Sequence, residues 1–218
     1  MARRTGRVLW SVLIVLVILA VGADIAARLA VQNMLASRLR SELALSEEPD
    51  VSLHGIPFLL YLLRERFPSA DIEARGVEAE GLRVRRLLLE VEDVRFSTKG
   101  GVVRAARGSG EAQVSGKALT AFLEAQGVPV RVRFPGGRVD VSAEVAGEEI
   151  AVTGTLELED GVLVFTPEEL GDIPTSAFSF EVELPDVVEG VRYRDLTIAD
   201  GAAVLSVRLS GSILRVVV

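Results

Sequence analysis

Apolar and polar residues follow three different patterns along the chain. The first is an uninterrupted apolar run of sixteen residues, 8–23, which ends at Asp24. Apolar residues then recur at helical spacings over residues 25–43, which predicts that a helix continues past the apolar run. From Asp71 onward the period becomes two, and glycine-bearing turns separate the alternating runs, so this part of the chain is predicted to form β-strands.

The alternating part predicts about ten strands, mostly joined by tight turns, and therefore a largely antiparallel sheet. The clearest hairpin places residues 128–134 and 139–145 on either side of Pro135-Gly136-Gly137, with apolar side chains on one face. The other predicted strands are residues 82–96, 102–106, 150–158, 162–164, 178–184, 191–198, 203–209 and 213–218. Residues 110–117 are predicted to be a turn that leads into a helix.

Two helices are predicted within this β-rich part. Residues 57–67 form the first, because Pro57 is tolerated in a first helical turn. Residues 115–126 form the second, since Ser115 is a favourable N-cap and Gly127 a favourable stop. The apolar face of this second helix consists of Leu119, Phe122 and Leu123. We expect an α+β fold in which a long, curved, largely antiparallel sheet wraps on a few helices.

The apolar run at the N-terminus is either a membrane anchor or a signal peptide. Sixteen residues fall between the about 20 of a membrane span and the about 7–15 of a signal h-region. Val21-Gly22-Ala23 offers a cleavage site, but the predicted continuation of the helix favours a retained anchor. The expected organisation is an anchor or signal segment over 1–23, a helical extension over 24–45 and a β-rich domain over 46–218.

Charge and composition restrict the location and the function of the chain. Arg3, Arg4 and Arg7 favour a cytoplasmic N-terminus, so the domain is expected on the periplasmic side of a cell membrane that the chain crosses once. The rest of the chain contains 21 of the 24 basic residues and all 31 acidic ones. This excess of negative charge argues against a nucleic-acid binder. Cysteine is absent and His54 is the only histidine, so we expect neither a zinc site nor a Ser-His-Asp triad, no cofactor and no enzyme activity.

The segment of residues 56–63 is apolar on every side, and Arg64-Glu65-Arg66 follows it. A helix of this composition is buried in a core or contacts lipid, and the sequence leaves both alternatives open. The predicted lipid-contacting residues are Phe58, Leu59, Tyr61, Leu62, Leu63 and Phe67, with Leu119, Phe122 and Leu123 as a second wall. Arg64 and Arg66 are the candidates for contact with a lipid headgroup, because guanidinium groups bind phosphate.

These residues resemble a known family. The segment VSLHGIPFL at residues 51–59, with its Gly-x-Pro-Phe-Leu motif, resembles the opening of the LmeA-like phospholipid-binding proteins of actinobacterial envelopes. The resemblance continues in Gly76-Val77, the strand at residues 87–96, the helix ALTAFL at residues 118–123, Leu184-Pro185, Gly190, Leu196 and Asp200-Gly201. Family members often carry a glycine soon after the motif, whereas this chain has none in Arg64-Glu65-Arg66.

The resemblance implies a lipid-binding fold similar to tubular lipid-binding (TULIP-like) domains, with phospholipid as the ligand. It also implies a role in maintaining envelope lipids or glycolipids, with the cell membrane and an envelope glycosyltransferase as candidate partners. The alternative is an envelope scaffold that binds no lipid and contacts a membrane enzyme. Co-purified phospholipid would distinguish these two functions.

Overall fold

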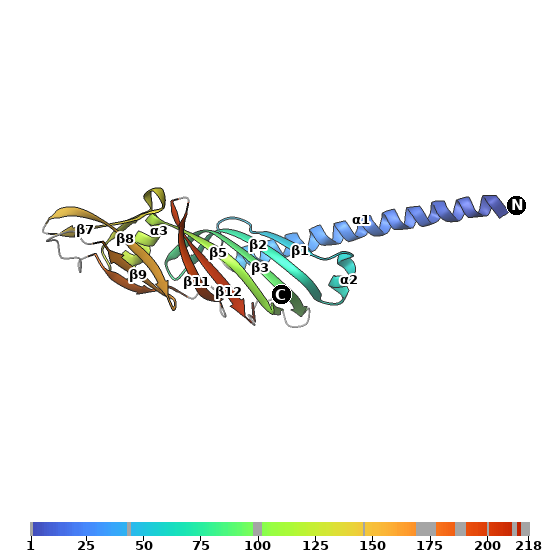
Figure 1. Ribbon diagram of the computed structural model, residues 1–218. Coiled ribbons are helices and arrows are strands. Elements are labelled where there is room, and N and C mark those ends of the chain that lie inside the picture. Colours follow the sequence, from blue (N-terminus) through green and yellow to red (C-terminus); the bar gives the residue numbers. More distant parts are fainter. Residues whose placement is uncertain are drawn as a thin grey trace.

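The computed structural model describes residues 2–42, 45–97, 102–145, 147–168, 178–185, 191–199, 201–210 and 213–214. The molecule is elongated, and the N-terminal helix α1 (Ala2–Glu42) protrudes from one end (Figure 1). It is the one helix among the described residues that is long and apolar enough to cross a membrane. The helix is continuous through Asp24, and its side chains from Trp10 to Ala23 are exposed.

The larger of two sheets curls into a half-barrel beside the second half of α1. Its hydrogen-bonded strands follow the order β1-β2-β3-β5-β12-β11, and every pairing is antiparallel. The strands are β1 (Asp50–His54), β2 (Arg66–Ala79), β3 (Leu82–Ser97), β5 (Arg107–Ser115), β11 (Val191–Ala199) and β12 (Ala202–Ser210). Two short strands, β4 (Val102–Arg104) and β13 (Ile213–Leu214), pair beside β3.

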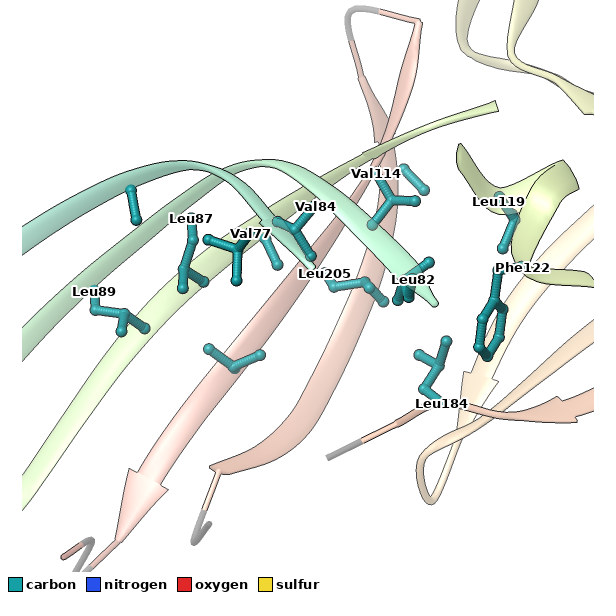
Figure 2. Packing of buried hydrophobic residues seen from close by; sticks show 14 of the residues in the cluster. Val77, Leu82, Val84, Leu87, Leu89, Val114, Leu119, Phe122, Leu184 and Leu205 are labelled. Carbon is teal, nitrogen blue, oxygen red and sulfur yellow. The ribbon is translucent and has the colours of Figure 1, made fainter. Parts of the chain in front are cut away.

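The apolar face of the half-barrel forms one half of the core. Leu87, Leu89 and Leu205 project from this face in Figure 2 and are buried. Leu35 and Ala36 of α1 are buried in the same cluster of apolar side chains, together with β1 residues such as Leu53. The second half of α1 is therefore packed into the folded domain, and only the first half stands clear of it.

The smaller sheet lies at the end of the molecule away from the α1 N-terminus (Figure 1). Its order is β10-β9-β8-β7-β6, again antiparallel throughout. The strands are β6 (Arg131–Arg133), β7 (Val139–Val145), β8 (Glu148–Glu159), β9 (Val162–Pro167) and β10 (Phe180–Glu183), and a 3-10 turn (Pro135–Gly137) joins β6 to β7. Helix α3 (Gly116–Ala125) packs where the two sheets meet, and Phe122 points toward Leu184 (Figure 2).

Two irregular positions bend the long β2–β3 hairpin. The register passes from Arg75–Arg86 to Val77–Val84 and skips Gly76, which has a φ of +64°. It also skips Asp93, whose φ is +52°. At each position the two-residue spacing of buried side chains is broken. For example, Leu89 and Val91 are buried on β3, but the next buried side chain is Val94, three residues further on. Interruptions of this kind increase local twist and curvature, which is how a flat hairpin becomes part of a half-barrel.

The α+β fold with curved, largely antiparallel sheets and few helices is confirmed, with four differences in detail. The strands divide into two sheets instead of one, and thirteen strands lie within the described residues. The helix predicted over residues 57–67 is the shorter α2 (Phe58–Leu63), and Phe67 belongs to β2. The turn was expected over residues 110–117, but residues 110–115 belong to strand β5 (Arg107–Ser115). Residues 99–101, between the predicted strands 82–96 and 102–106, and the end of the last predicted strand, 215–218, lie outside the described residues.

Strand β5 escaped prediction because glycine and serine interrupt its alternation at Gly108-Ser109-Gly110. These glycines are required by close approach to β3. A Cβ at Gly108 would lie 2.7 Å from the carbonyl oxygen of Glu90, and one at Gly110 would overlap the carbonyl oxygen of Leu88.

Gly110→Ala is therefore expected to lower the free energy of unfolding by about 1–3 kcal/mol, the usual cost of overpacking. The neighbouring Ser109→Ala is the matched control, because Ser109 is exposed and its substitution adds no atom. Thermal unfolding followed by circular dichroism measures both variants. Equal melting temperatures for the two variants would contradict the packing argument.

Candidate functional site

Helix α2 is held against α1 by polar contacts from the first charged residue after the apolar run. Pro57 precedes α2 and offers no side-chain cap. Instead the backbone N–H groups of Phe58 and Leu59 donate to the two carboxylate oxygens of Asp24, at 2.9 and 2.8 Å. These bonds satisfy donors that the start of a helix leaves without intrahelical partners. Asp24 thus fixes α2 at the level where the apolar run of α1 ends.

Arg28, one turn further along α1, strengthens the same junction. Its guanidinium donates to the carbonyl oxygen of Gly55 at 2.7 Å and stands 5.6 Å from the ring centroid of Phe58. A guanidinium at this distance from an aromatic ring is attracted to it. The segment from Gly55 to Leu59 therefore has a fixed position relative to α1.

The predicted lipid-contacting residues of this region divide into a buried and an accessible set. Phe58 and Phe67 are fully buried, with ring centroids 5.0 Å apart. Leu59, Tyr61 and Leu62 are half-buried. Leu63 is 83% exposed. The two phenylalanines consequently form a support under α2, and the accessible apolar surface belongs to the other residues.

A cavity of about 430 Å³ opens beside α2 and contains both predicted headgroup arginines. Its lining consists of Tyr61, Arg64, Arg66, Pro68, Glu92, Asp93 and Arg107. Arg66 donates to Asp93 at 2.5 Å, and Arg107 is paired with Glu92. The side chain of Arg64 forms no ion pair with any described residue. With three guanidinium groups and two carboxylates, the cavity has an excess of positive charge and can accept an anion such as phosphate.

The arginines around Asp93 lower the pKa of its carboxyl group. The hydrogen bond from Arg66, and next the one from Arg95, lower the pKa of Asp93 below its usual value. A lowered pKa in the folded state means that this group stabilises the fold above its unfolded pKa of about 4 and that the contribution is lost as the pH falls through the folded pKa.

Asp93→Asn is the variant that tests this pH dependence, because asparagine also tolerates the positive φ at this position. The melting temperature of the variant is expected to lie below that of the wild type at pH 7. The difference should shrink as the pH falls below about 4 and through the lowered pKa of the folded wild-type carboxyl. A difference that stays constant from pH 7 to acid would contradict the assignment.

The second predicted wall lies elsewhere. Leu119, Phe122 and Leu123 are buried to 2% exposure or less on α3, where the two sheets meet. Figure 1 shows α2 and α3 at opposite ends of the larger sheet. The Ser115 hydroxyl caps α3 as predicted, by accepting from the Ala118 N–H at 3.2 Å. The structure therefore brings Arg64 and Arg66 together with α2 but does not bring the α3 residues to them.

A larger cavity, of about 740 Å³, lies along the polar side of the half-barrel. It is lined from six strands and carries five carboxylates, those of Asp50, Asp71, Glu73, Glu90 and Glu111. Arg194 and Arg208 are its two basic residues. The net negative charge opposes the entry of a phosphate. The smaller cavity beside α2 is thus the better candidate for an anionic headgroup.

Sequence reasoning missed three charged residues of the smaller cavity. Glu92 and Arg107 meet because β3 pairs with β5 in a register that places them opposite each other. Asp93 joins them at the bend of β3. Because strand β5 was not predicted, the pairing of its residue Arg107 with Glu92 could not be predicted either.

His54, the single histidine, lies on the exposed side of β1. Its Nε2 atom is 2.7 Å from a carboxylate oxygen of Asp71 on β2, and both side chains are about half exposed. Within the described residues, no cluster of three histidine or acidic side chains is arranged to hold a metal ion. This pair is a cross-strand surface contact.

Comparison with known families is informative for nearly all of the folded chain. Residues 22–210 match the LmeA-like phospholipid-binding family. The chain belongs to this family. The matched region begins just before Asp24 and includes α2, α3 and every strand of the two sheets except β13. The LmeA-like family is defined by phospholipid binding and is not a known enzyme family. Neither the curated proteins nor the solved structures contain a match to the chain.

Proposed function

We propose that this LmeA-like protein is a membrane-anchored, extracytoplasmic phospholipid-binding protein, in which the cavity beside α2 receives the lipid phosphate. The observation that carries this proposal is the guanidinium of Arg64, which has no ion-pair partner among the residues that the structure describes, beside the paired Arg66 and Arg107. The phosphate of a phospholipid would bind Arg64 first and compete with Asp93 and Glu92 for the other two arginines.

The acyl chains would contact the accessible apolar residues next to the cavity. Leu59, Tyr61 and Leu62 are half-buried around α2, and Leu63 is exposed. Phe58 and Phe67 would support these residues from beneath. The α3 residues Leu119, Phe122 and Leu123 would stabilise the junction of the sheets, and we assign the lipid to the α2 end of the domain.

A retained anchor is supported by the continuity of α1. Cleavage after Ala23 would make Asp24 the N-terminus and place a new charged amine beside the carboxylate that caps α2. The burial of Leu35 and Ala36 in the core cluster also supports a helical extension at 24–45 that is held against the domain at 46–218. With Arg3, Arg4 and Arg7 on the cytoplasmic side, the domain would face the cell envelope.

The cellular role we propose is the maintenance of envelope lipids or glycolipids, with an envelope glycosyltransferase as a candidate partner. The competing function is a scaffold that contacts a membrane enzyme without binding lipid. The cavity supports the first, because its guanidinium groups can bind the phosphate of a lipid.

Native mass spectrometry of the full chain, extracted in detergent from cells without added lipid, tests the proposal. The full chain is necessary, because a domain cut near Leu45 would lose the buried residues of α1. We expect a co-purified phospholipid that is depleted in Arg64→Ala. Lipid-free wild-type protein would favour the scaffold, whereas equal lipid occupancy in both samples would place the phosphate away from Arg64. A periplasmic reporter fused at the C-terminus and a carbonate wash of membranes test the topology and the anchor.

A further inference from the structure

Three large apolar side chains next to the candidate cavity are directed away from the core. Ile56 and Leu63 are both 83% exposed, and Leu60 is 40% exposed. Leu60 and Leu63 are three residues apart on α2 and therefore share one face of the helix. Apart from residues of α1, these are the exposed large apolar side chains among the described residues.

The position of α2 along α1 indicates what covers these side chains. Residues 8–23 span about 24 Å at about 1.5 Å per helical residue, whereas the hydrocarbon core of a bilayer is about 30 Å thick. About four more residues are needed, which extends the buried length to the level of residues 24–27. This is the level at which Asp24 holds the start of α2.

The polar groups at this level have partners, as a site at the edge of the hydrocarbon requires. Asp24 accepts two backbone N–H donors, and Arg28 donates to the carbonyl oxygen of Gly55. Groups with such partners enter a medium of low polarity at a smaller cost than unpaired ones. Figure 1 also shows α2 at the end of the domain from which α1 protrudes, so it faces the bilayer that α1 would cross.

We propose that Ile56, Leu60 and Leu63 dock into the leaflet of the bilayer that α1 crosses. The partner is thus the lipid surface itself, and the docked helix would set the cavity of Arg64 at headgroup level. This inference rests on the proposed anchor, and it goes beyond it because a tethered domain need not touch the membrane. A docked α2 would let a lipid enter the cavity without crossing water.

The test uses the full chain in vesicles of phosphatidylcholine and phosphatidylglycerol. Because the chain has no native cysteine, Leu63→Cys carries a single nitroxide label. Glu157→Cys, at an exposed position of β8 in the smaller sheet, is the matched control. Collision of each label with oxygen and with a water-soluble nickel chelate reports its depth. Trp10, the single tryptophan, independently reports insertion of α1 through quenching by brominated lipids.

We expect the label at position 63 to lie about 5–10 Å below the headgroup boundary and the label at position 157 to lie in water. A water-exposed label at 63 together with a quenched Trp10 would overturn the docking and leave the anchor intact. A label at 63 that is shielded from both reagents would indicate a protein partner, such as a second copy, and would also overturn it. A label in lipid with an unquenched Trp10 would refute the anchor and, with it, docking into a bilayer that α1 crosses.

Discussion

Phe67→Ala is expected to lower the free energy of unfolding by about 3–5 kcal/mol, as large-to-small substitutions of buried phenylalanine do. Phe67 is fully buried on β2, its ring lies 5.0 Å from that of Phe58, and the ring of Tyr61 lies 6.2 Å away. Truncation would leave a cavity under α2 that this short helix cannot fill. Thermal unfolding of the full chain in detergent, followed by circular dichroism, measures the effect.

Leu63→Ala is the matched control, because Leu63 belongs to the same predicted lipid-contacting set but is 83% exposed. Its effect on stability should stay within about 0.5 kcal/mol, as for most surface substitutions. The contrast separates residues that support the site from residues available to a ligand. Similar destabilisation by the two variants would mean that α2 is covered in the protein as purified.

Local sequence signals were sufficient to predict the helices and strands whose ends carry common capping or turn residues. Helix α3 was predicted because Ser115 and Gly127 mark its ends, and the hairpin around Pro135-Gly136-Gly137 because its strands alternate clearly. Helix α2 was placed correctly but extended too far. Glu65 ends it by adopting a φ of +51°, and a glutamate at that position gives no stop signal of the kind that glycine gives.

Contacts between distant residues could not be predicted in the same way. Asp24 and Phe58 are 34 positions apart, and their hydrogen bond depends on how α1 crosses the domain. The pairing of Arg107 with Glu92 depends on a strand whose glycines hide its alternation. The arginines after α2 were recognised as headgroup candidates from their type and order alone. Their carboxylate partners and Arg107 needed the fold.

Residues 56–63 are partly buried and partly exposed in the structure, so burial in a core accounts for only part of this segment. Phe58 is buried as a core residue, whereas Ile56, Leu60 and Leu63 remain exposed. A six-residue helix held by Asp24 can present both faces because its backbone position does not depend on burying every apolar side chain. The composition that left the prediction open thus reflects a segment with one buried and one exposed apolar part.

Arg64→Glu is expected to weaken phospholipid binding by about 10- to 100-fold, which corresponds to the loss of one hydrogen bond to a charged group. The arginine has no ion-pair partner among the described residues, so the substitution breaks no contact that the fold needs. It also places a carboxylate near Glu92 and Asp93, which reverses the charge that a phosphate would meet. Titration calorimetry of the full chain in detergent with short-chain phosphatidylglycerol measures the affinity.

Arg85→Glu is the matched control for Arg64→Glu, because it makes the same change in net charge at an exposed position of β3 outside the cavity. Its affinity for the short-chain lipid should equal that of the wild type. Arg64→Lys should give an intermediate loss, since lysine keeps the charge but not the paired geometry of a guanidinium. If Arg64→Glu and Arg85→Glu bound the lipid equally well, the phosphate would lie outside this cavity. The larger cavity along the polar side of the half-barrel could not be the phosphate site instead, because its five carboxylates would repel the same ligand.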